Sequence, residues 1–137
     1  MQTWRYLFAG LAWLFLVAVI VQVFLAGIGL FGVSDMELHR GVGYNLPILP
    51  LLMLLLAWPA RIERRTVWLT LTLFLVAMIQ TLLPSFRGSV AVIAALHPVN
   101  ALLVFYLAVV AARRSLALVR VVAEPAMATP DTAPEQA

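Results

Sequence analysis

The sequence predicts an all-α fold: an integral membrane four-helix up-and-down bundle with a disordered C-terminal tail. Two observations support this prediction. Of the 137 residues, 64% are hydrophobic and 11% are charged, whereas soluble domains are about half apolar and about a quarter charged. In addition, short segments containing arginine separate four uncharged runs. Each run is long enough for the roughly 20 residues that cross a bilayer core.

The bundle is expected over residues 1–122. Its helices are predicted near residues 4–32, 36–58, 66–84 and 89–112, and residues 115–122 are expected to continue the last helix along the membrane surface. The first apolar run exceeds the roughly 7–15 residues of a signal-peptide core, so it is interpreted as a membrane span. Short connections make consecutive helices antiparallel neighbours.

The last segment, residues 123–137, differs in composition from the rest of the chain. It has no apolar periodicity and contains Pro125, Pro130 and Pro134. Such a composition predicts a disordered cytoplasmic tail. No internal repeat is evident in the sequence.

The arginines predict the orientation of the helices. All nine basic residues are arginine. Arg40 and Arg87 lie on one side of the predicted bundle, and the other side carries Arg5, Arg61, Arg64, Arg65, Arg113, Arg114 and Arg120. The positive-inside rule therefore places both termini in the cytoplasm of a multi-pass protein of the bacterial inner membrane. Because the arginines lie at membrane edges, the expected partner is the lipid bilayer, and nucleic acid is excluded.

Prolines and one polar motif interrupt the helical pattern. Pro47 and Pro50 are predicted to bend the second helix, and Pro98 the fourth. Ser34 and Glu37 have the spacing of a capping box, which predicts the start of the second helix.

Few polar side chains fall within the spans: Gln22, His39, Asn45, Gln80, His97 and Asn100. Polar groups in hydrocarbon are costly and normally face the bundle interior. By the predicted topology, all six lie in the outer half or near the middle of their helices. A site that opens toward the outside is therefore expected.

The two histidines suggest a cofactor. His39 and His97 lie on the second and fourth helices, which are diagonal in an up-down bundle, at depths that differ by about 6 Å at ~1.5 Å per residue. Two opposed imidazoles are the usual axial ligands of a b-type haem. The chain has no cysteine, which excludes thiolate metal sites, Fe–S clusters and covalently attached haem.

Neighbouring residues fit a haem hypothesis. Gly43 follows His39 by one helical turn and would leave space for the ring, and Asn100 shares the face of His97. Arg40 and Arg87 at the outer rim are predicted partners for two propionates. The expected role is electron transfer with quinol or with a redox partner protein near the outer face.

Two alternatives stay open on the sequence. One is a structural or accessory membrane subunit that forms homo- or hetero-oligomers, with helices packed through Gly27 and Gly29. The other is a binder of quinone or another lipid-like ligand. The spans contain no carboxylates, so no acid–base catalysis by the chain itself is expected.

Two stretches resemble known families. Leu38-His-Arg-Gly-Val-Gly-Tyr44 and Leu96-His-Pro-Val-Asn-Ala-Leu102 resemble signature stretches of a family of uncharacterised small four-helix bacterial membrane proteins, over roughly residues 17–112. More distantly, the His-Arg pair and the later histidine resemble the four-helix halves of haem A synthase and the b561-type cytochromes. This resemblance implies that His39 and His97 are axial ligands. The chain departs from these proteins in having one histidine pair, and in having only Glu37, at the rim, where haem A synthase carries a carboxylate near its catalytic site.

The topology can be tested with reporter fusions. A reporter fused after residue 36 is expected to lie outside the cytoplasm, and one fused after residue 62 inside it, because arginine-rich loops stay cytoplasmic. Activity assays of a paired periplasmic and cytoplasmic reporter check this. A cytoplasmic signal at residue 36 or an external one at residue 62 would contradict the predicted orientation.

Overall fold

The computed structural model describes residues 1–123, with side chains described to residue 119. In chain order, the elements are α1 (Gln2–Leu30), α2 (Glu37–Asn45), α3 (Ile48–Ala57), α4 (Arg64–Leu82), the 3₁₀ helix η1 (Leu83–Gly88), α5 (Ala91–Ala94) and α6 (Leu96–Ala123). The expected disordered tail lies outside the described residues.

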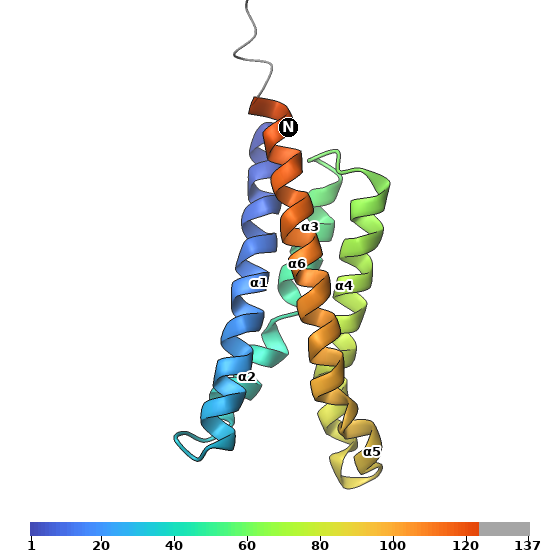
Figure 1. Cartoon of the computed structure of the whole chain (residues 1–137). Coiled ribbons are helices and arrows are strands. Elements are labelled where there is room, and N and C mark those ends of the chain that lie inside the picture. Colours follow the sequence, from blue (N-terminus) through green and yellow to red (C-terminus); the bar gives the residue numbers. More distant parts are fainter. Residues whose placement is uncertain (124–137) are drawn as a thin grey trace, which may run out of the picture.

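These elements form four helical stretches that are long and apolar enough to cross a membrane. They are Gln2–Leu30, Glu37–Ala57, Arg64–Gly88 and Ala91–Val119. Figure 1 shows them as an up-and-down bundle in which α1 and α4 start at the same end. The predicted all-α four-helix fold is therefore confirmed, and the chain is a multi-pass membrane protein in its architecture.

The helices pack in a closed ring. α1 packs against α3 and α6, and α4 packs against the same two helices. α1 therefore lies diagonally opposite α4, and α3 lies opposite α6. The short helix α2 packs on α1, which leaves the second and fourth spans diagonal as the sequence predicts.

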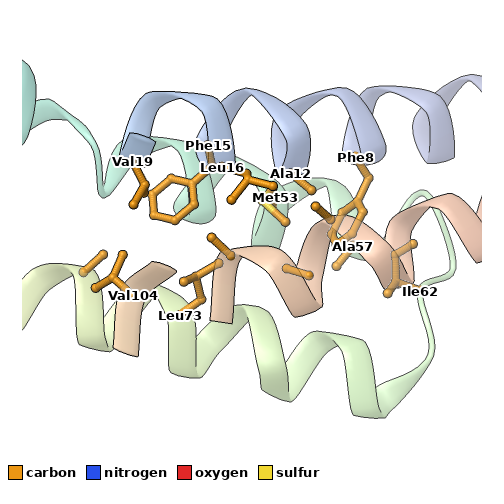
Figure 2. Close-up of a cluster of buried hydrophobic side chains, with 14 of the residues drawn as sticks. Phe8, Ala12, Phe15, Leu16, Val19, Met53, Ala57, Ile62, Leu73 and Val104 are labelled. Atoms are coloured by element: carbon orange, nitrogen blue, oxygen red, sulfur yellow. The ribbon is translucent and has the colours of Figure 1, made fainter. Parts of the chain in front are cut away.

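The apolar core occupies the half of the bundle that holds the N-terminus and the α3–α4 loop. Figure 2 shows side chains from all four spans meeting there. Its buried members include Phe8, Ala12, Phe15, Leu16, Val19, Met53, Ala57, Leu73, Ala77, Val104, Ala108 and Ala111. Alanine and threonine at many interior positions let the helices approach closely, as is usual in membranes.

The opposite half is packed less tightly. The described side chains of α2 and α5 include no buried residue. Figure 1 shows the α1–α2 hairpin diverging from the α4–η1–α5 end of the molecule. By the predicted topology this is the outer half, and it contains both histidines.

The prolines act differently from one another. Pro47 is the N-cap of α3 and separates it from α2, as expected, while Pro50 is buried in the first turn of α3. The fourth span, Ala91–Val119, is interrupted at Ala95 between α5 and α6, and Pro98 lies in the first turn of α6. Backbone N–H groups in a first turn have no partner within the helix, so proline removes no bond there.

The predicted capping box is also not formed. The N-cap of α2 is Met36, and an oxygen of Asp35, Oδ1, accepts a hydrogen bond from the Glu37 N–H at 3.1 Å. The Ser34 hydroxyl instead donates to the Asp35 carbonyl at 3.2 Å. Asp35 thus takes the role predicted for Ser34, because an aspartate side chain readily accepts a hydrogen bond from the backbone N–H two residues ahead of it.

Two contacts close the end of the bundle that carries most arginines. Arg5 Nε donates to the Ala60 carbonyl at 3.2 Å. Arg114 lies 3.7 Å from Glu63 in an exposed ion pair. Such exposed pairs contribute little stability, so the core packing holds this end together.

Phe15 and Phe24 on α1 offer a matched test of that core. Phe15 is 1% exposed and Phe24 is 65% exposed. Phe15→Ala should lower the free energy of unfolding by about 2 kcal/mol, less than in a water-soluble core because lipid is as apolar as the interior. Phe24→Ala should change it little. Reversible unfolding in detergent micelles measures both, and equal effects would contradict the observed packing.

Candidate functional site

The two histidines approach each other from opposite corners of the bundle. His39 lies in the first turn of α2 and His97 in the first turn of α6. Their ring centroids are 6.1 Å apart, and the ring planes are inclined by 78°. Both side chains are half-buried. The depth mismatch expected from residue counting is therefore absorbed by the break at Pro47 and by the late start of α6.

Each imidazole is held by a glutamine of the preceding helix. His39 Nδ1 lies 3.2 Å from the backbone oxygen of Gln22, and His97 Nδ1 lies 3.1 Å from that of Gln80. In both cases the glutamine precedes the histidine by 17 residues. A ring N–H directed at a backbone carbonyl fixes both the tautomer and the orientation of a histidine.

The Gln22 side chain joins α1 to α2. Gln22 is 7% exposed. In the orientation that pairs each amide atom, its nitrogen donates to the His39 carbonyl at 3.1 Å and to His39 Nδ1 at 2.8 Å, and its oxygen accepts from the Gly43 N–H at 2.8 Å. A Cβ on Gly43 would lie 3.6 Å from the Gln22 amide oxygen site. Gly43 thus faces the Gln22 amide. That Gly43 leaves space for a haem ring stays a prediction.

A larger network joins α4 to α6. Gln80 Nε2 lies 3.3 Å from His97 Nε2. The Asn100 amide donates to Gln80 Oε1 at 2.7 Å and to the Val76 carbonyl at 3.1 Å. With Nδ1–H as donor and Nε2 as acceptor, His97 is a neutral imidazole with both nitrogens paired.

The two rim arginines lie apart from this network. Arg40 is exposed and pairs with Glu37 on its own helix at 3.1 Å. Arg87 is exposed in η1. Their predicted role as propionate partners stays a prediction.

Two imidazoles make an incomplete metal site. Within residues 1–123, no group of three His, Cys, Asp or Glu side chains is placed to hold a metal ion. His39 and His97 can therefore supply only two ligands, and the remaining ligands of any metal would have to come from a bound molecule. Among the described residues, no hydrogen bond reaches His39 Nε2.

Sequence reasoning identified the histidines and Asn100 but gave no role to Gln22 and Gln80. It noted them only as polar residues in the spans. The signal that identifies them is the spacing of 17 residues to a histidine in both hairpins. That spacing becomes meaningful once each hairpin is known to return its second helix alongside the first.

One family matches part of the chain. Residues 22–87 match a family of unknown function, DUF6220. The match includes Gln22, His39, Gly43 and Gln80, and it ends before His97. This similarity agrees with the resemblance to an uncharacterised family. No curated protein and no solved structure matches the chain.

The Gln80–Asn100 bond can be measured by a double-mutant cycle. Gln80→Leu and Asn100→Leu should each destabilise the bundle, with a coupling of about 0.6 kcal/mol and at most about 1.7 kcal/mol, the range for polar pairs in membranes. Unfolding in detergent measures this coupling. Thr72, which bonds within its own helix, supplies the control: Thr72→Val and Asn100→Leu should be additive. Additivity of the Gln80 and Asn100 changes would contradict the network.

Proposed function

We propose that His39 and His97 are the axial ligands of one b-type haem, and that the protein acts as an electron-transfer or redox subunit of the membrane. The observation that carries this proposal is the approach of the two imidazoles from diagonal helices, with ring centroids 6.1 Å apart.

The separation suits two ligands of one iron. Imidazoles bound on opposite sides of a metal have ring centres about 6 Å apart, from about 2 Å per metal–nitrogen bond and about 1 Å from each nitrogen to its ring centre. The distance between the His39 and His97 rings is therefore compatible with a shared metal, and it also lies in the range of a direct edge-to-face ring contact.

The hydrogen bonds of the rings also support the proposal. Metal-bound histidines generally direct their other ring nitrogen at a carbonyl or carboxylate. Here both Nδ1 atoms face backbone carbonyls, of Gln22 and Gln80. For His97 that arrangement presents Nε2 as the ligand atom and raises its basicity. His39 would present Nε2 in the same way when its Nδ1–H donates to the Gln22 carbonyl.

The donor set favours a macrocycle over a free ion. Two imidazoles alone satisfy neither a tetrahedral nor an octahedral ion. A porphyrin supplies four nitrogens of its own, so two axial histidines complete the set. When bound, the haem would supply one-electron chemistry, while the chain holds the two imidazoles neutral and oriented.

Ligand binding at His97 has a consequence for Gln80. The lone pair on His97 Nε2 faces the Gln80 amide, so a metal bond would replace that hydrogen bond. Asn100 donates to Gln80 Oε1 and would hold the Gln80 side chain in place, while the Gln80 Nε2–H group would lose its acceptor. Asn100 therefore supports the site through Gln80.

The position of the histidines limits the electron path. One haem in the predicted outer half cannot carry electrons across the whole membrane. The proposed donor or acceptor is quinol or a redox protein at the outer face, with Arg40 and Arg87 available to the propionates. The proposed location is the bacterial inner membrane, with both termini in the cytoplasm.

A structural or accessory subunit is the second candidate. It is favoured by the complete pairing of His97, whose nitrogens both have partners without any metal. A Cβ on Gly27 would meet nothing within 4 Å, so this part of α1 offers a small-residue surface on which a helix of another subunit could pack.

The visible spectrum of the purified protein tests the haem. We expect sharp α and β bands after dithionite reduction, as bis-imidazole haem gives, and their loss or strong shift in His39→Ala and His97→Ala. Thr72→Val, outside the site, should leave the bands unchanged. Colourless, iron-free protein from haem-replete cells would overturn the proposal and favour the structural subunit. Co-purified quinone without iron would favour the lipid-like ligand.

A further inference from the structure

The two histidine–glutamine pairs are separated by the same number of residues along the chain. Adding 58 to the number of Gln22 gives Gln80, and adding 58 to that of His39 gives His97. Within each pair the residues are 17 positions apart. The first two helical spans and the last two therefore carry the same polar pair at the same place.

The buried positions follow the same register. In α1 and α4, the matched buried residues are Phe8 with Thr66, Ala12 with Thr70, Phe15 with Leu73 and Val19 with Ala77. In α3 and α6, they are Pro50 with Ala108, Met53 with Ala111 and Ala57 with Ser115. One offset without gaps thus matches seven buried positions in the two hairpins.

The residue types explain why the sequence shows no repeat. Phe8 corresponds to Thr66, and Met53 to Ala111, so side-chain size and polarity differ at most matched positions. Burial, the polar pair and a few leucines, among them Leu38 and Leu96, are shared. The common register of burial therefore runs against the expectation of no internal repeat.

The packing has the matching symmetry. α1 lies diagonally opposite α4, α3 lies opposite α6, and both hairpins start at the same end (Figure 1). This is the arrangement of parallel repeats related by an axis along the membrane normal. His39 and His97, 6.1 Å apart, lie across that axis from each other.

We infer that the chain is a tandem repeat of one helical hairpin, and that each hairpin contributes an equivalent half-site to a single ligand on the axis. This inference rests on the proposed function and sharpens it. A ligand held by equivalent half-sites needs two equivalent faces, which a planar metal macrocycle has. Gln22 and Gln80 are the positioning residues, because each fastens the helix that bears the histidine to the helix before it.

Matched glutamine variants of the full-length, haem-loaded protein test this inference. Gln22→Leu and Gln80→Leu should shift the midpoint potential in the same sense and by similar amounts, because each loosens the support of one axial imidazole. They should likewise alter the low-spin ferric electron paramagnetic resonance signal. Gln2→Leu is the control, since Gln2 is exposed at the start of α1 and should change neither readout.

The outcomes separate the inference from the haem proposal. A shift in one variant only, shifts of opposite sense, or no shift in coloured protein would overturn the equivalent half-sites and leave the haem in place. Colourless wild-type protein would overturn the haem. The thermal unfolding of the same variants would then decide the repeat: similar losses from Gln22→Leu and Gln80→Leu support it, and a loss from one alone overturns it.

Discussion

Polar side chains inside a bilayer must find partners within the protein, because lipid offers none. Two glutamine–histidine pairs meet this constraint here, and much of the outer half of the bundle depends on them. Gln22 ties α1 to α2, and Gln80 ties α4 to α6. Within the described residues, no buried polar side-chain atom lacks a hydrogen bond. The pairs therefore hold the hairpins together where apolar packing is thin.

The two ends of the bundle differ in how tightly they are packed and in how polar they are. The end with the N-terminus is filled by a continuous core that includes Phe8, Met53 and Leu73 (Figure 2). The other end has the histidines and little buried apolar surface. Buried apolar packing is thus concentrated at one end of the bundle, and the polar network lies at the other.

The two hairpins pair their glutamines with different residues. Pro98 and Asn100 in α6 correspond to Arg40 and Val42 in α2 by the same offset of 58. Asn100 donates a further hydrogen bond to α4, at the Val76 carbonyl. In the first hairpin, the Gly43 N–H instead donates to the Gln22 amide oxygen. Different residues thus meet the same requirement, namely that the amide be fully paired beside the imidazole.

The sequence by itself determined the four spans, because uncharged runs of bilayer length between arginines admit few other structures. It also singled out His39, His97 and Asn100, since polar residues in hydrocarbon are conspicuous by chemistry alone. The start of α2 could not be read correctly, because it depends on where a helix begins to within one or two residues.

Only the tertiary structure decided which polar groups meet. The partnership of Gln22 with His39, and of Gln80 with His97, needs the second helix of each hairpin to return at one particular depth beside the first. The approach of the two imidazoles needs the ring of helices to close with α2 and α6 across the axis. Hydropathy fixes how many helices cross the membrane. Their rotation and depth depend on how side chains of different helices pack together, so they cannot be read from any one segment of the sequence.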